Sequence, residues 1–439
     1  MLKKRVSTLF AKQLQEGEEV ILAGWVRELR DFGKLKFIIL ADGEGEMQIT
    51  AKKGEVEEDL LSLIDAIGRE WVIAVKGKIR KNEKAPSGKE VVPEEILVLN
   101  RSESVLPLEV RSRARAELPT RLDNRFLDLR RPETGAIFRI RSEISNAIRE
   151  FFHRNGFVEI HTPKIVASAT ESGANVFPIL YFEREAFLAQ SPQFYKQAAI
   201  IGGLERVFEI APAFRAEKHH TVRHLTEYTS VDMEVGFIEG YEDVMEWVEK
   251  LIVYVLSSVK ERCGNELKLL GKEIEVPRVP FPRVTMRKAY KLLEAEGIEV
   301  EYGEELDTER EKLFGKIIRE KFGHEFVFLT EFPWKVRPFY TYRKDSEPEW
   351  TCSFDLIYRG TEIVTGGQRE HRYEKLLENC REKGINPESV EFYLRMFRYG
   401  APPHGGCGLG MDRLVMLLLG LANVREAALF PRDPERLEP

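Results

Sequence analysis

Apolar and polar residues alternate along the first hundred positions, a pattern typical of half-buried β-strands. Five such runs lie at 19–26, 36–40, 47–50, 71–77 and 95–99. Turn residues separate several of them, as in Asp42-Gly43, and one helical stretch is expected at about 55–68. So many short strands in under a hundred residues predict a small β-barrel.

The hydrophobic spacing changes to that of a helix after residue 136. Ile137, Ile140, Ile144 and Ile148 recur at intervals of three and four, and Asn155-Gly156 ends the helix that they predict. Strands are expected at 157–160, 206–210 and 228–237, and helices at 241–262 and 308–321. The predicted class is α+β, with domains at 1–103 and 132–439, an arginine-rich hinge at 104–131 and a small insertion around 265–345.

Composition narrows the class of protein. Hydrophobic residues make up 43% of the chain, and no apolar run reaches the ~18 residues of a membrane helix. The start of the chain has no apolar export signal, and the four cysteines form no C-x-x-C pair, so we expect a cytoplasmic protein without a membrane partner. The net charge of −6 does not indicate nucleic acid, but basic stretches at 76–89 and 111–131 would suit a polyanion.

Two arginines lie in short motifs suited to nucleotide phosphates. Arg215 lies in the sequence Phe-Arg-Ala-Glu, and Arg413 closes a glycine-rich segment that starts at Gly406. A guanidinium binds phosphate oxygens in pairs, and glycines allow a ligand to approach the backbone closely. A dinucleotide-binding loop is excluded because Met411 interrupts its glycine pattern. We therefore expect a bent ATP between two cationic planes.

In their order, these motifs resemble the three signature motifs of the class II aminoacyl-tRNA synthetases. The helix that ends at Gly156, with the following strand and Pro163, resembles motif 1, which forms the dimer interface in that family. Residues 214–227 resemble motif 2 and 406–413 resemble motif 3. The resemblance covers 131–439 and implies an antiparallel catalytic sheet flanked by helices.

Within that class the chain is similar to the aspartyl enzymes of the archaeal and eukaryotic type. The segments 190–196, 229–234 and 366–372 match that group, and the first hundred residues resemble its five-stranded anticodon-binding barrel of the oligonucleotide-binding (OB) type. The resemblance implies Mg²⁺, with L-aspartate, ATP and tRNA(Asp) as substrates. It also implies a homodimer.

The resemblance assigns a set of residues to aspartate. Lys196 and Arg369 would hold the β-carboxylate, which could not be buried without partners. The position of Lys196 is usually apolar in asparaginyl relatives, so it argues for aspartate. The ammonium group would contact Glu171, Gln193 and Asp232, and Arg215 and Thr365 complete the implied set.

A second set is implied for ATP and metal. Arg215, Glu362 and Arg413 would be catalytic, with Arg215 on the α-phosphate, Arg413 stacked on adenine and Glu362 as the Mg²⁺ ligand. Thr365 stands where the family usually has the metal-proximal Ser. The remaining ATP contacts would come from Ala216, Glu217, Arg223, His224, Leu225, Gly410, Met411 and Asp412.

Four barrel residues are candidates for reading the anticodon. Phe37 would stack on a base and Gln48 would read a base edge. In strict enzymes of the family a tryptophan and a lysine stand where this chain has Arg27 and Pro86. Their absence favours charging of tRNA(Asn) as well as tRNA(Asp), which would call for an amidotransferase partner.

Several alternatives stay open. A strictly tRNA(Asp)-specific enzyme and a lysyl or asparaginyl enzyme are the nearest. An asparagine-forming relative would usually lack the barrel. A catalytically altered tRNA-binding paralogue would be expected to have lost Arg215, Glu362 or Arg413, and all three are present.

Overall fold

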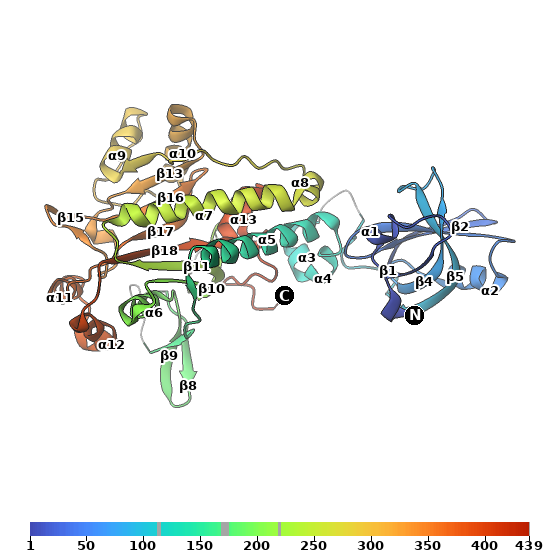
Figure 1. The fold of residues 1–439 in the computed structure, drawn as a ribbon, viewed down its shortest axis with the longest axis horizontal. Coiled ribbons are helices and arrows are strands. Elements are labelled where there is room, and N and C mark those ends of the chain that lie inside the picture. Colours follow the sequence, from blue (N-terminus) through green and yellow to red (C-terminus); the bar gives the residue numbers. More distant parts are fainter. Residues whose placement is uncertain (112–115, 168–174, 218–220, 439) are drawn as a thin grey trace. The chain divides into compact units, whose positions relative to one another are not determined.

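The computed structural model describes residues 1–111, 116–167, 175–217 and 221–438. It divides into two compact units, Met1–Gly135 and Ala136–Pro439 (Figure 1). The hinge expected at 104–131 falls in the first unit, where it carries two short helices, α3 (Leu118–Asp123) and α4 (Arg125–Asp128).

The first unit contains the five-stranded barrel that the alternating pattern predicts. The barrel is closed, with strand order β1-β2-β3-β5-β4. Inward-facing side chains such as Leu22, Leu40 and Val75 are fully buried and form its core. Its elements are α1 (Thr8–Ala11), β1 (Glu19–Asp31), β2 (Leu35–Ala41), β3 (Glu46–Lys52), α2 (Glu58–Ala66), β4 (Val72–Lys81) and β5 (Lys89–Asn100).

The second unit is built on an eight-stranded sheet of order β12-β13-β16-β17-β18-β11-β10-β6. The neighbouring strands pair antiparallel except at the two edges, where β12–β13 and β10–β6 are parallel. The predicted fold class is therefore confirmed. The strands are β6 (Val158–Glu159), β10 (Arg206–Phe214), β11 (Glu227–Gly236), β12 (Arg283–Thr285), β13 (Phe326–Thr330), β16 (Ser353–Tyr358), β17 (Thr361–Gln368) and β18 (His404–Gly410).

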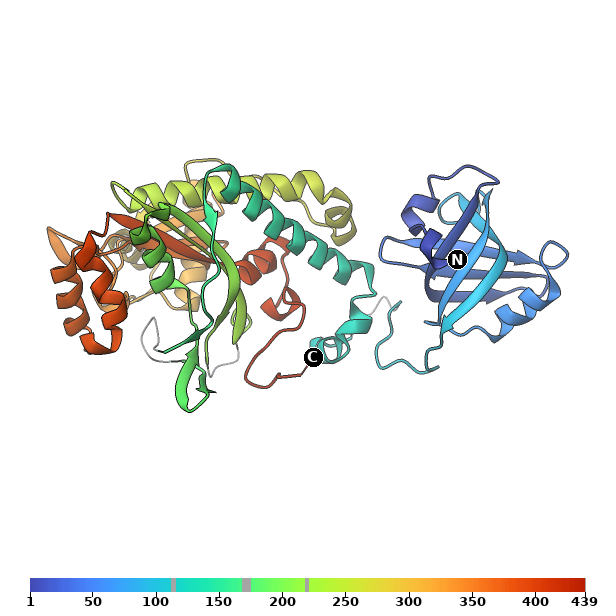
Figure 2. The ribbon, with the colours of Figure 1, turned by 60° about the horizontal axis from the view of Figure 1, so that its bottom comes forward.

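Three helices cover one face of this sheet (Figure 2). They are α5 (Pro132–Arg154), α7 (Tyr241–Arg262) and α13 (Met411–Leu419). Helix residues such as Ile144 and Val248 share one core with sheet residues such as Val364 and Leu409. Burial of this face leaves the opposite face of the central strands for polar side chains.

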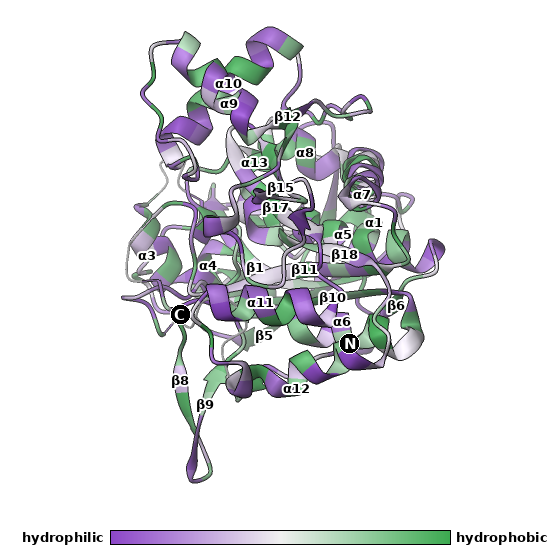
Figure 3. Ribbon diagram, turned by 90° about the vertical axis from the view of Figure 1, so that its left-hand side faces the viewer, coloured by the Kyte–Doolittle hydropathy of each residue, from purple (hydrophilic) through white to green (hydrophobic). Residues whose placement is uncertain are grey.

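Two smaller clusters flank the sheet. The segment expected as an insertion contains α8 (Gly264–Leu270), α9 (Met286–Ala295) and α10 (Thr308–Phe322), and α9 and α10 pack with β12 and β13 around buried residues such as Tyr290 and Phe314. Figure 3 shows that α9 and α10 each carry both hydrophilic and hydrophobic residues. The second cluster combines α6 (Gln193–Ala199) with α11 (Tyr373–Glu382) and α12 (Glu391–Leu394).

The remaining strands form two small sheets. One has the order β7-β9-β8, and its β8–β9 hairpin projects from the body of the unit in Figure 1. The other is a two-stranded hairpin. The bounds are β7 (Ile165–Val166), β8 (Pro178–Tyr181), β9 (Arg184–Leu188), β14 (Arg343–Lys344) and β15 (Glu347–Thr351).

Candidate active site

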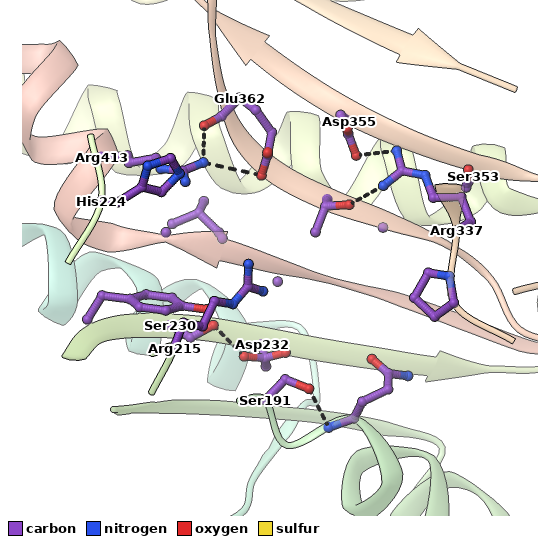
Figure 4. Close-up of a pocket in the computed structure, with 18 of the residues that line it drawn as sticks. Ser191, Arg215, His224, Ser230, Asp232, Arg337, Ser353, Asp355, Glu362 and Arg413 are labelled. Atoms are coloured by element: carbon purple, nitrogen blue, oxygen red, sulfur yellow. Dashed lines mark hydrogen bonds and ion pairs between the residues drawn. The ribbon is translucent and has the colours of Figure 1, made fainter. Parts of the chain in front are cut away.

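A cavity of about 340 Å³ opens on the polar face of the eight-stranded sheet (Figure 4). Register places its floor in a single row across four strands. Asp232 on β11 pairs with Gly408 on β18, Gly408 with Thr365 on β17, and Thr365 with Asp355 on β16. Residues two apart on a strand share a face, and the paired residues Ser230 on β11 and Gly410 on β18 accordingly line the same cavity.

The glycines of β18 leave space above the strand because they have no side chain. Gly406, Gly408 and Gly410 alternate along the strand and therefore face the cavity side. A Cβ at Gly406 would lie 2.1 Å from Glu234 Oε2, and a Cβ at Gly408 would narrow the cavity beside Asp232. The glycine spacing of the sequence thus makes room both for buried acids and for a ligand lying on the sheet.

One end of the cavity holds two cations and two carboxylates. Lys196, on α6, donates from Nζ to Asp232 Oδ1 at 2.9 Å and lies 3.3 Å from Glu234 Oε2. Arg369, just after β17, donates from Nε to Glu234 Oε1 at 2.9 Å. All four side chains are buried. Mutual pairing offsets the large cost of burying isolated charges.

The ionisation of this group follows from that pairing. Burial alone would lower the pKa of Lys196, but Asp232 and Glu234 raise it above its ordinary value. Burial would likewise raise the pKa of Glu234, and Arg369 with Lys196 brings it below its ordinary value. Both cations therefore stay charged where a carboxylate ligand would arrive. Sequence reasoning missed Glu234, although its spacing of two from Asp232 on a strand could have placed both on one face.

The other end is lined by arginines from motifs 2 and 3. Arg413, on α13, donates from Nη1 to the Glu362 carbonyl at 3.1 Å and lies 3.5 Å from the carboxylate of Glu362. Figure 4 shows this pair on one side of the opening and Arg215 on the other. Burial, followed by Arg413 and Arg223, lowers the pKa of His224 to about 4. This histidine is therefore neutral at physiological pH.

The insertion contributes to this end of the cavity. Glu311, on α10, forms an ion pair with Arg223 and accepts a hydrogen bond from the Glu362 backbone N–H at 2.6 Å. Arg337, which follows β13, donates to Asp355 Oδ1 at 2.7 Å and to Thr365 Oγ1 at 3.0 Å. Sequence reasoning assigned none of Glu311, Arg337 and Asp355 to the site.

Asp355 has the most displaced carboxyl pKa of the floor. Burial raises it to about 7, with Glu362 acting in the same direction and Arg337 opposing both. The pKa of Glu362, in contrast, is lowered, because Arg413 and Arg215 outweigh its burial. In the part of the chain that is described, no group of three or more His, Cys, Asp or Glu side chains is arranged to hold a metal ion.

The structure brings together most residues that the sequence assigned to the site. Two differ: Met411 is buried in the core beneath the sheet, and Ala216 does not line the cavity. Glu171 lies outside the described residues. Those that line the cavity are Gln193, Lys196, Arg215, Glu217, Arg223, His224, Leu225, Asp232, Glu362, Thr365, Arg369, Gly410, Asp412 and Arg413.

The four barrel candidates differ in accessibility. Arg27 is buried in an ion pair with Glu70 and donates to the Arg130 carbonyl at 3.0 Å. Gln48 is also buried, and its amide donates to Glu90 at 2.9 Å. Pro86 is exposed, and Phe37 is partly exposed, with its ring edge-to-face against Phe32.

Two family models match the chain. The OB-fold nucleic acid binding domain matches residues 20–99, and the model described as tRNA synthetases class II (D, K and N) matches residues 117–434. The chain belongs to the class II tRNA synthetases of the D, K and N group. It is thus an aminoacyl-tRNA synthetase with tRNA as a partner, and the arginine-lined cavity lies within its catalytic domain.

Curated relatives of this synthetase carry two kinds of name. A protein of Pyrococcus furiosus named aspartate–tRNA(Asp) ligase is 52% identical over the full length of both chains. A protein of Aeropyrum pernix named aspartate–tRNA(Asp/Asn) ligase is also 52% identical over the full length of both chains. Overall identity therefore does not separate the two tRNA specificities.

Solved structures agree on the fold of this synthetase. Asparaginyl-tRNA synthetase from Pyrococcus horikoshii, complexed with asparaginyl-adenylate, has a TM-score of 0.92 at 34% identity and covers 99% of both chains. Aspartyl-tRNA synthetase from Entamoeba histolytica has a TM-score of 0.89 at 33% identity, over 99% of this chain and 93% of its own. The choice of amino acid thus has to come from the site.

Among the described residues, no helix is long and apolar enough to cross a membrane.

Proposed function

We propose that this synthetase activates L-aspartate with ATP and transfers it to tRNA(Asp) and tRNA(Asn). The observation that carries the choice of amino acid is the pair of buried cations, Lys196 and Arg369, at one end of the cavity. A β-carboxylate could accept from both cations, whereas the amide nitrogen of asparagine would set its own donors against theirs. The names of the curated relatives support the same choice.

The reaction follows from the two ends of the cavity. The α-carboxylate of aspartate attacks the α-phosphorus of ATP in line, and pyrophosphate leaves from the opposite side. Arg215 stabilises the charge that grows on the α-phosphate, and Arg413 holds the adenine. The terminal hydroxyl of the tRNA then attacks the aspartyl-adenylate and releases AMP. Positioning supplies most of the catalysis, so no nucleophilic Ser or Cys is needed.

Oxygen donors beside the nucleotide end fit Mg²⁺. The ion prefers carboxylates and other hard oxygen ligands, and Glu362 offers a carboxylate, with Thr365 and Asp355 in the adjoining row of the floor. Arg337 donates to both Thr365 and Asp355, so Glu362 is the carboxylate of this set that Arg337 does not bind. Bound Mg²⁺ would neutralise phosphate charge.

Charging of the two tRNA transcripts tests the proposal. The purified chain, with ATP and Mg²⁺, should aspartylate both tRNA(Asp) and tRNA(Asn), and asparagine or lysine should not replace aspartate in pyrophosphate exchange. Exchange with asparagine alone would refute the amino-acid assignment. Aspartylation of tRNA(Asp) alone would leave a strict enzyme and refute the broader specificity.

Arg215→Ala tests the assigned catalytic group. Removal of the guanidinium should lower aspartate-dependent pyrophosphate exchange by about a thousandfold, the size expected for a single transition-state contact. The melting temperature should stay within a few degrees of the parent, because Arg215 is only partly buried. Near-parental exchange would remove Arg215 from the mechanism.

The barrel supports the broader tRNA specificity. Arg27 is already paired with Glu70, and Pro86 has neither a charge nor a backbone N–H to offer. Neither residue can then supply the contacts of a strict enzyme. An enzyme that makes aspartyl-tRNA(Asn) would require an amidotransferase to convert its product. We also propose a homodimer through the motif 1 region, testable by light scattering.

A further inference from the structure

We propose that His404, acting through Gln197, fixes the orientation of the Gln193 amide so that its oxygen faces the ammonium group of the amino-acid substrate. This inference rests on the proposed function, because it assumes an amino-acid ligand in the cavity. His404 and Gln197 are positioning residues, and neither lines the cavity. A chain of hydrogen bonds connects His404 to Gln193, and the donor in each bond is determined by the previous bond.

The chain begins at a backbone carbonyl, which can only accept. His404 Nδ1 lies 2.7 Å from the Pro402 carbonyl oxygen, so Nδ1 carries the proton. The ring is fully buried on β18, and burial, followed by Arg369 and His371, lowers its pKa although Glu234 opposes this. A neutral ring protonated at Nδ1 presents a lone pair at Nε2.

The lone pair decides which way Gln197 points. His404 Nε2 lies 2.8 Å from the Gln197 amide nitrogen, which must therefore donate to it. A reversed amide would set its oxygen against the lone pair. Gln197 Oε1 consequently faces away from His404 and accepts from the hydroxyl of Tyr393 at 3.0 Å. Burial raises the pKa of Tyr393 well above its ordinary value, so the hydroxyl keeps its proton.

The same oxygen then decides the orientation of Gln193. Gln193 Nε2 donates to Gln197 Oε1 at 2.8 Å, across one turn of α6. The other atom of the Gln193 amide, Oε1, is an acceptor, and Gln193 lines the cavity. An ammonium group has donors only, so the oxygen binds it and the amide nitrogen would repel it. The tautomer of His404, two hydrogen bonds away, thus determines that Gln193 offers an acceptor to the cavity.

This arrangement gives the α11–α12 cluster a function in the site. Tyr393, on α12, is fully buried and stacks on Phe194 of α6 with ring centroids 4.2 Å apart. Its hydroxyl fills the second acceptor position of Gln197 Oε1 and so strengthens the chosen orientation. A hydrophobic cluster remote from the chemistry therefore contributes to how the substrate is recognised.

Two substitutions at His404 separate orientation from packing. The side chain of His404→Asn can still donate to the Pro402 carbonyl but is too short to accept from Gln197. The longer side chain of His404→Gln can place an amide oxygen near the position of Nε2 and keep that acceptor. We expect His404→Asn to raise the KM for aspartate about tenfold, the size of one hydrogen bond to a charged group. ATP should keep its KM, and His404→Gln should restore most of the affinity for aspartate.

A ligand without the ammonium group provides the decisive readout. Succinate retains both carboxylates of aspartate, so its inhibition constant should stay within twofold between the parent and His404→Asn. Equal losses for aspartate and succinate, or equal KM values in the two His404 variants, would overturn the proposal. If His404→Asn does not fold, Gln197→Leu, which removes the acceptor for Gln193, should give the same selective loss, and an unchanged aspartate KM would overturn the proposal. Absence of aspartate-dependent exchange in the parent would instead refute the proposed function.

Discussion

At the scale of single residues, the site contains one group of charges that balance one another and one carboxylate, Asp355, whose ionisation is opposed by burial and by a neighbouring carboxylate. Lys196 and Arg369 face Asp232 and Glu234 in equal number, and all four are buried. Asp355 faces Arg337, but Glu362 lies near enough to oppose its ionisation. The first group is stable as it stands, whereas Asp355 is held in a state that costs folding free energy at neutral pH.

Asp355→Asn should therefore stabilise the protein in a pH-dependent way. The folded-state pKa of about 7 lies above the ordinary value for aspartate, so the stability associated with its proton is complete at low pH and lost as pH rises toward 7. In Mg²⁺-free buffer, the variant should melt about 5 °C above the parent at pH 8, with the difference vanishing near pH 4. Thermal unfolding across that pH range measures it.

Asp345→Asn provides a control of opposite sign. Hydrogen bonds from Tyr342 and Arg372 lower the pKa of the Asp345 carboxyl, so its contribution to stability is present at neutral pH and lost on acidification. That side chain is largely exposed, and the loss in the variant should be small. A melting difference for Asp355→Asn that does not change with pH would contradict the assigned ionisation.

At the scale of secondary-structure elements, α10 connects the insertion to the nucleotide end of the site. Its Glu311 carboxylate binds the Arg223 side chain and the Glu362 backbone at once. Because Arg223 is proposed to contact the triphosphate, α10 positions its guanidinium before the nucleotide binds. The insertion is thus a support for motif 2 as well as a separate cluster with its own core.

Glu311→Gln tests this support. The amide oxygen can still accept from Glu362, but the amide nitrogen then faces the guanidinium of Arg223 and cannot hold it. We expect the KM for ATP to rise about fivefold while the KM for aspartate stays unchanged, as pyrophosphate exchange would measure. Glu309→Gln, on the exposed side of the same helix, should match the parent. Equal ATP affinity in all three proteins would exclude a role for α10.

The elements also show how far the sequence could lead. Alternation predicted the barrel strands, and three- and four-residue spacing predicted α5, because both patterns are local. Lys196 and Arg369 were found through motifs. Glu311 and Arg337 were not, because their partners Arg223 and Thr365 lie 88 and 28 residues away and no local pattern encodes such pairing. Met411 was assigned to ATP from its motif position, yet helical geometry turns it into the core.

At the scale of the whole molecule, the residues proposed to choose the amino acid and those proposed to choose the tRNA lie in different units of the chain. The cavity is built entirely from residues of Ala136–Pro439, and the anticodon candidates lie in the barrel of Met1–Gly135. On this proposal, a change in the barrel should alter which tRNA is charged without altering aspartate activation. This separation makes tRNA specificity testable by a single exposed residue.

Pro86→Lys should narrow the specificity toward tRNA(Asp). The position is exposed in the β4–β5 loop, so a lysine can be added without repacking the barrel, and it supplies the cation that the family resemblance implies for strict enzymes. Position 27 is less suitable, because replacement of Arg27 would leave Glu70 buried with a partner lost. We expect the kcat/KM for tRNA(Asn) to fall about fivefold relative to tRNA(Asp), the size of a modest base contact, with aspartate-dependent exchange unchanged.

Glu83→Lys is the control. It adds positive charge to the same loop and should leave the ratio of the two kcat/KM values unchanged, because charge alone acts on the phosphate backbone that both tRNAs have. An unchanged ratio in Pro86→Lys would place the determinant of tRNA choice elsewhere in the barrel.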